Sequence, residues 1–106
     1  MAEGNNKELI MNIVVRYTDI LKKEMKVEKV ILYGSYSKGS QREDSDIDVA
    51  VVSSHFSGDM MEDQLKLMKY RRSIDLRIEP MPFLPGEFNE SNPFVREIIQ
   101  TGTVIV

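Results

Sequence analysis

The stretch YGSYSKGSQREDSDIDVAVV, residues 33–52, joins a glycine- and serine-rich segment to the most hydrophobic run of the chain. Two aspartates, Asp46 and Asp48, stand two residues apart where that run begins. Successive side chains of a strand point to opposite faces, so both carboxylates should share one face, roughly 6–7 Å apart along the strand. Ile47 and Val49 then point to the other face and pack there. Two neighbouring carboxylates repel each other, which raises a pKa or requires a bound cation.

The length and composition of the chain predict one globular domain. Its 106 residues, taken as a single domain 1–106, leave room for one modest core, and 42% are hydrophobic and 29% charged. Cysteine is absent, which excludes disulfides and thiolate metal sites. The N-terminus has no basic segment followed by an apolar run, and no apolar stretch is long enough to span a membrane, so we expect a cytoplasmic protein.

The charge balance gives no support for a nucleic-acid-binding face, because the net charge is -3. The densest basic group lies near the end of an expected helix, where cations complement the helix dipole. This group consists of Lys66, Lys69, Arg71 and Arg72.

Hydrophobic periodicity predicts helices and strands that alternate along the chain. We expect, in chain order, helix 6–25, strand 29–35, strand 46–52, helix 59–72, strand 73–80, helix 93–101 and a short strand 103–106. Asp59 and Asn92 are suitable helix caps, and Pro80 should stop the third strand. This pattern favours an α/β (α+β) fold in the order α-β-β-α-β-α-(β), with helices packed on a mixed β-sheet.

A third carboxylate, Asp75, stands in the alternating segment SIDLRI, with Ile74 and Leu76 pointing to the opposite face. If this strand lies beside the strand of Asp46, three carboxylates converge on one spot. Oxygen ligands without histidine or cysteine suit Mg²⁺ or Mn²⁺ rather than zinc. The alternative is that Asp75 is a charge on the exposed face of a half-buried strand.

The segment GSYSKG directly follows the first expected strand. Its small residues let backbone amides approach an anion, and a helical turn from Ser35 would aim N–H groups at phosphate oxygens. Lys38 adds a positive charge, although the spacing is not that of a Walker A loop. Together, the loop and the carboxylates describe a polyphosphate site in which two divalent metals activate a hydroxyl and stabilise leaving pyrophosphate.

These residues resemble a known family. Gly34-Ser35, ten intervening residues and Asp46-Ile47-Asp48 are similar to the G-S-x10-D-x-D signature of the minimal nucleotidyltransferases, within the DNA polymerase beta-like nucleotidyltransferase superfamily. Asp75 resembles that superfamily's third carboxylate. The resemblance implies the nucleotidyltransferase fold and transfer of a nucleoside monophosphate, expected to be AMP from ATP, to a hydroxyl.

The resemblance also implies roles for individual residues. Asp46 and Asp48 would bind two Mg²⁺ ions, with Mn²⁺ as an alternative, and Asp75 would complete the catalytic site. Gly34 and Ser35 would hold the triphosphate. Lys38 stands where many relatives carry arginine, and it keeps the charge without the bidentate fork.

The family further implies a partner. Larger relatives carry an additional helical domain for the acceptor, and we expect no such domain here, so another chain or a second copy should support the acceptor. In minimal relatives the usual partner is a small helical HEPN-type protein, a toxin for which the nucleotidyltransferase is the antitoxin.

Two alternatives stay open: a non-catalytic antitoxin that neutralises its partner by contact, and a nucleotidyltransferase acting on small molecules. Base recognition has no motif here. Tyr36, inside the loop, is compatible with three roles: stacking on a base, contact with a partner, or packing of the loop itself. His55 is interpreted as a solvent-exposed loop residue.

Overall fold

The computed structural model describes residues 2–34 and 46–106, with side chains of the first helix from Lys7 onward. In chain order the elements are α1 (Ala2–Glu24), β1 (Lys29–Tyr33), β2 (Ile47–Val52), α3 (Met60–Tyr70), the 3₁₀ turn η1 (Arg71–Ser73), β3 (Ile78–Phe83), α4 (Pro93–Thr101) and β4 (Thr103–Val104). The predicted α/β fold and its element order are confirmed.

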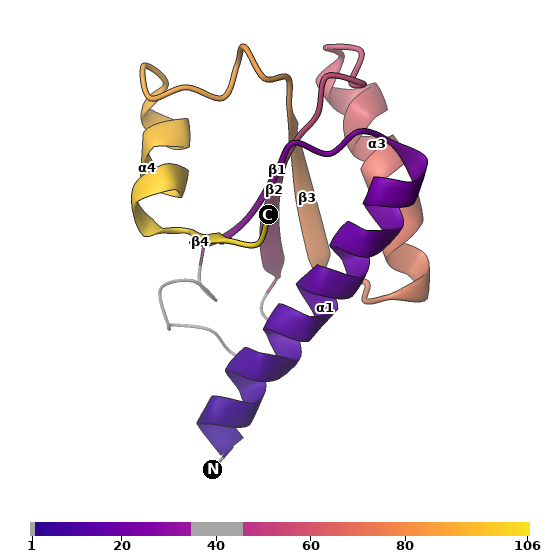
Figure 1. Ribbon diagram of the computed structural model, residues 1–106, viewed down its shortest axis with the longest axis vertical. Coiled ribbons are helices and arrows are strands. Elements are labelled where there is room, and N and C mark those ends of the chain that lie inside the picture. The colour runs from indigo at the N-terminus through magenta and orange to yellow at the C-terminus, as the bar shows by residue number, and fades with distance from the viewer. Residues whose placement is uncertain (1, 35–45) are drawn as a thin grey trace.

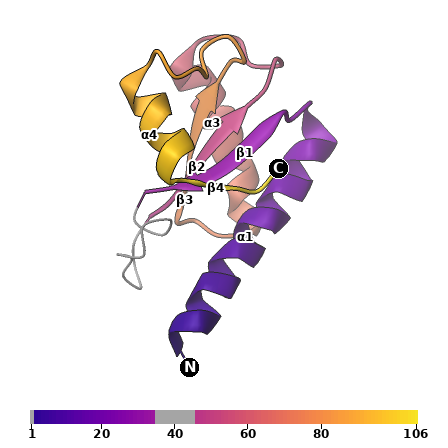
Figure 2. The same cartoon turned by 60° about the vertical axis from the view of Figure 1, so that its left-hand side comes forward.

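The four strands form one mixed sheet in the order β3-β2-β1-β4. β1 pairs antiparallel with both β2 and β4, whereas β2 and β3 run parallel and are joined through α3. Helices α1 and α3 lie on one side of the sheet and α4 lies on the other (Figure 1). Figure 2 shows α4 to the left of the strands and α1 along their lower right. The sheet therefore separates two apolar layers.

The alternation of β2 distributes its side chains between these layers. Ile47, Val49 and Val51 are buried against α1 and α3, as the two-residue period predicts. Ala50 and Val52 face α4 instead, together with Val95 and Ile98 of that helix. Asp48 has the same parity as Ala50, so its carboxylate lies on the α4 side of the sheet.

Capping residues confirm the predicted starts of two helices. The Asp59 side chain accepts a hydrogen bond from the Glu62 N–H (3.1 Å), and Asn92 accepts one from the Phe94 N–H (2.9 Å). Helix α1 instead begins at Ala2, upstream of the predicted start at residue 6. The early start places Gly4, Asn5 and Asn6 inside the helix, where each costs about 0.7–1 kcal/mol relative to alanine. No helix in the described ranges combines the length and apolar character needed to cross a membrane.

The third strand lies further along the chain than predicted. The predicted span was 73–80, but β3 runs from Ile78 to Phe83. The N–H groups of Ile74 and Asp75 both donate to the Arg71 carbonyl (2.9 Å each), which closes a turn where the alternating pattern suggested a strand. The Asp75 carboxylate also accepts the Arg77 N–H (2.9 Å), and a local side-chain bond of this kind competes with strand pairing.

The prediction that Pro80 ends this strand is also wrong. The Arg77 and Phe83 carbonyls accept ladder bonds from β2, so the odd-numbered residues of β3 face that strand. Pro80 and Pro82 occupy even-numbered positions, whose N–H groups would point away from β2. A proline there removes no ladder bond and is acceptable on an edge strand.

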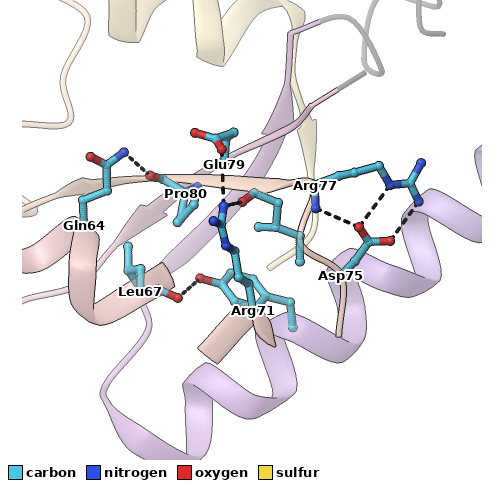
Figure 3. Close-up of polar contacts among 9 residues, drawn as sticks. Gln64, Leu67, Arg71, Asp75, Arg77, Glu79 and Pro80 are labelled. Carbon is cyan, nitrogen blue, oxygen red and sulfur yellow. Dashed lines mark hydrogen bonds and ion pairs between the residues drawn. The ribbon is translucent and has the colours of Figure 1, made fainter. Parts of the chain in front are cut away.

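The outer edge of β3 is closed by side chains from the preceding helix and turn (Figure 3). Gln64 donates to the Pro80 carbonyl (3.0 Å), and Arg71 Nη1 donates to the Ile78 carbonyl (2.7 Å). The Ile78 N–H is also occupied, because it donates to the Asp75 carbonyl (3.3 Å). Arg71 therefore has a structural role beyond the helix-dipole contact expected for the basic group.

We predict that Arg71→Ala lowers the free energy of unfolding by about 1–3 kcal/mol, because it leaves the Ile78 carbonyl without its partner. Urea denaturation measures this change. The matched control is Arg72→Ala, which removes an exposed cation from the same turn and should change stability by less than about 0.5 kcal/mol. Equal losses in the two variants would show that the edge contact contributes nothing.

Candidate functional site

Three strands bring polar side chains together at one end of the sheet. Tyr33 is the cross-strand partner of Asp48 on β1, and Glu79 is its partner on β3. Residues directly opposite on neighbouring strands share a face, so all three side chains lie on the α4 side. Asp46 is exposed immediately before β2. The site therefore combines three carboxylates with one phenol.

The electrostatics of this end reflect the crowding of negative charge. Burial raises the pKa of the Asp48 carboxyl, and the charges of Asp46 and Glu79 raise it further. Burial, followed by the charges of Asp48 and Glu79, raises the pKa of Tyr33 to about 12. The phenol is thus protonated at neutral pH. A bound cation would relieve the repulsion among the carboxylates.

Glu79 is the carboxylate that the sequence reasoning missed. It is the penultimate residue of the segment SIDLRIEP, and only its pairing with Asp48 distinguishes it from other exposed acids. A parallel pairing of the two strands, which places Ile47 opposite Ile78 in the core, is the signal that could have identified Glu79.

The structure does not bring Asp75 to the other carboxylates, so the predicted convergence of Asp46, Asp48 and Asp75 is wrong. Asp75 precedes β3 in the turn, where its carboxylate accepts bonds from the N–H (2.9 Å), Nε (3.0 Å) and Nη2 (2.8 Å) of Arg77. Side-chain hydrogen bonding to Arg77 holds the pKa of Asp75 below its ordinary value. Figure 3 shows Asp75 turned to Arg77, on the other side of the strand from Glu79. A catalytic role for Asp75 stays a prediction without geometric support.

Glu79 is held by Arg71, with 3.3 Å between Oε2 and Nη1. Within residues 2–34 and 46–106, no three histidine, cysteine, aspartate or glutamate side chains are already placed to hold a metal ion. The donors present are nevertheless oxygen atoms, as Mg²⁺ prefers. Asp46 and Asp48 could ligate it directly, and Glu79 could join after leaving Arg71.

Gly34 connects the carboxylates to the predicted phosphate loop. Its φ of +78° favours glycine, and an added Cβ would overlap Oδ2 of Asp48 and lie 3.1 Å from its Cγ. Glycine at this position therefore leaves room for the Asp48 carboxylate. The other predicted loop residues, Ser35 and Lys38, lie outside the described residues, as does Tyr36.

A surface pocket of about 390 Å³ lies at the opposite end of β3 and is lined by Met60, Pro82, Phe83, Glu87, Asn89, Ser91 and Asn92. Phe83 is four residues beyond Glu79, or about 13 Å along the strand, so the pocket is separate from the carboxylates. His55 is exposed as expected, and its Nδ1 accepts a bond from the Lys26 N–H (3.2 Å).

Residues 16–106 match a family model described as Polymerase beta, Nucleotidyltransferase. The chain belongs to this family. The predicted resemblance to the minimal nucleotidyltransferases of the polymerase beta-like superfamily is confirmed.

Individual relatives agree with this assignment. The protein of Methanocaldococcus jannaschii named "Putative protein adenylyltransferase MJ1379" is 31% identical over 98 residues, covering 92% of this chain and 94% of that protein. The crystal structure of a "putative nucleotidyltransferase" from Sulfolobus solfataricus has a TM-score of 0.72 at 14% identity, covering 98% of this chain and 86% of that one. A toxin-antitoxin structure with AMP-PNP has a TM-score of 0.64 at 20% identity, covering 91% and 72%. The two structures share the fold of this nucleotidyltransferase.

We predict that Gly34→Ala destabilises the protein by about 1–2 kcal/mol, because the new methyl group overlaps Asp48 and alanine is strained at positive φ. Gly86→Ala is the matched control, since a Cβ there meets nothing within 4 Å. Thermal and urea unfolding of the two variants measure the difference. Similar stabilities would contradict the close contact between Gly34 and Asp48.

We also predict that replacing two aspartates by asparagine changes the stability in opposite directions at pH 7, in metal-free buffer with EDTA. The raised pKa of Asp48 means that its ionisation disfavours the folded state, so Asp48→Asn should increase the free energy of unfolding at pH 7. This gain should shrink as the pH falls through the raised pKa toward the ordinary value of 3.8.

Asp75→Asn is the control of opposite sign. The pKa of Asp75 is lowered, so its ionised form stabilises the fold above pH 3.8, and this contribution disappears only as the pH falls through the lowered pKa. The substitution should therefore destabilise the protein at pH 7. Urea denaturation between pH 4 and pH 7 tests both changes, and shifts of the same sign would show that the assigned environments are wrong.

Proposed function

We propose that this nucleotidyltransferase transfers AMP from ATP to a hydroxyl group of a protein partner and releases pyrophosphate. The observation that carries this proposal is the pairing of Asp48 with Glu79 across β2 and β3, next to Asp46 and directly beside Gly34. This arrangement supports Asp46, Asp48 and Glu79 as the ligands of two Mg²⁺ ions. It replaces Asp75 with Glu79 in the predicted set.

The chain's own residues would act as follows. Asp46 and Asp48 would hold the Mg²⁺ ions, while the loop beginning at Gly34 and Ser35, with Lys38, would hold the phosphate oxygens. Bound Mg²⁺ supplies charge neutralisation and lowers the pKa of the attacking hydroxyl. Glu79, released from Arg71, orients that hydroxyl and receives its proton.

The transfer itself is a displacement at the α-phosphorus. The acceptor oxygen forms a new bond to phosphorus as the bond between that atom and the bridging oxygen of the β-phosphate breaks. Pyrophosphate leaves with the electron pair of the broken bond. Glu79 lies on the edge strand and its side chain is 42% exposed, so the acceptor can reach it from the side of β3.

Two relatives support a protein acceptor. The Methanocaldococcus protein is named for protein adenylyl transfer, and the structural neighbour with AMP-PNP is a toxin-antitoxin assembly. The HEPN type is what the family resemblance of the sequence implies, and we infer on that basis that the acceptor is a small helical HEPN-type toxin and that this chain is its antitoxin. The partner supplies the acceptor hydroxyl.

The experiment incubates the chain with ATP labelled at the α-phosphate, Mg²⁺ and the protein encoded by the adjacent gene. We predict transfer of label to the partner, with a loss of about a hundredfold or more in Asp48→Ala and in Glu79→Gln. Asp75→Asn should retain most of the activity, assayed at a temperature where it is folded. Undiminished transfer by Asp48→Ala would refute the carboxylate mechanism.

Two other outcomes identify the alternatives. If Asp75→Asn abolishes transfer while Glu79→Gln does not, Asp75 is the third carboxylate. If no label is transferred, yet wild type and Asp48→Ala neutralise the partner equally in a growth assay, the chain is a contact-only antitoxin.

A further inference from the structure

An aromatic cluster connects α4 to the strands that carry the site. The ring of Phe94 packs edge-to-face on Tyr33, with centroids 5.8 Å apart and an interplanar angle of 83°. It also lies 6.3 Å from the ring of Phe83, at an angle of 36°. Asn92 caps the helix by accepting the Phe94 N–H (2.9 Å), which fixes the start of α4. The ring is therefore held in place from two strands and its own helix.

Phe94 nevertheless remains exposed. Its relative accessibility is 45%, whereas Phe56 and Phe83 are 6% exposed and Phe88 is partly buried. The next residue, Val95, is completely buried beneath α4. A large aromatic ring that is fixed in position but left partly open offers a flat apolar surface to a planar ligand.

The position of this ring relates it to the carboxylates. Tyr33, which Phe94 contacts, is the cross-strand partner of Asp48 and is the residue before Gly34. The charges of Asp48 and Glu79 both act on the Tyr33 phenol. Phe94 thus contacts the site through Tyr33 and is one aromatic ring away from the carboxylates, beside the strand that leads to Gly34.

The covalent structure of the donor nucleotide places its base near Phe94. The α-phosphate must lie at Asp46 and Asp48, and only the ribose separates it from the base. The acceptor is expected on the β3 side of the site, at Glu79. The donor nucleotide is then left with the β1 side, where Tyr33 adjoins the phosphate loop. Stacking needs no particular pattern of donors and acceptors, which agrees with a sequence that shows no base-recognition motif.

We propose that the exposed ring of Phe94, supported by Tyr33, is the stacking surface for the nucleobase of the donor nucleotide. This inference rests on the proposed nucleotidyl transfer and assigns a base subsite to it. Purine bases should bind better than pyrimidines, because the larger ring system covers more of the aromatic face.

Isothermal titration calorimetry in Mg²⁺ tests the subsite with two probes, α,β-methylene ATP and inorganic triphosphate. We predict that Phe94→Ala weakens binding of the nucleotide analogue about tenfold, the size of a single aromatic–base stack, and leaves triphosphate binding within about twofold. The matched control is Ile99→Ala on the same helix, where the side chain is 38% exposed, and it should change neither affinity. Phe94→Trp should retain nucleotide binding, and it keeps the test valid if the alanine variant folds poorly.

Each remaining outcome overturns the inference in a distinguishable way. Unchanged nucleotide affinity in Phe94→Ala excludes stacking, and an accompanying rise in KM for the protein acceptor would reassign the ring to that partner. Equal losses for both probes would mean that Phe94 only supports the fold. If wild type binds neither probe, the proposed function fails together with the subsite.

Discussion

The parallel register between β2 and β3 is the constraint on which the rest of the molecule depends. It places Ile47 opposite Ile78 in the core and Asp48 opposite Glu79 on the other face. A shift of β3 by one residue would turn Glu79 into the core and move Ile78 to the opposite face, so the apolar layer against α1 and α3 fixes the acidic pair on the other face. The same strand pairing therefore determines both the packing of the core and the arrangement of the site.

Local sequence patterns were sufficient to predict much of this structure. The alternation in DIDVAVV correctly assigned Ile47 and Val49 to the core, and the caps Asp59 and Asn92 located two helices. The position of β3 was not recoverable in the same way. The segment around Asp75 alternates like a strand, but its ion pair with Arg77 and its bonds to the Arg71 carbonyl stabilise a turn.

The third carboxylate could not be identified without that register. Asp75 and Glu79 have the same parity, so the period of a strand does not separate them. What separates them is the partner strand: Glu79 lies opposite Asp48, while Asp75 lies before the pairing begins. Glu79 also has competing partners, since Arg71 neutralises it from the edge while Asp48 repels it from within the sheet. Functional sites often contain charged groups that destabilise the fold.

The closed edge of β3 limits how another protein can approach Glu79. Pro80 and Pro82 supply no N–H groups, the Ile78 N–H is occupied, and side chains already bind the carbonyls of Ile78 and Pro80. A neighbouring chain therefore cannot dock here by adding a strand, the route that many peptide-binding sheets use. In the proposed reaction, a protein that delivers a hydroxyl to Glu79 would therefore have to be held by side-chain contacts rather than by main-chain pairing along β3.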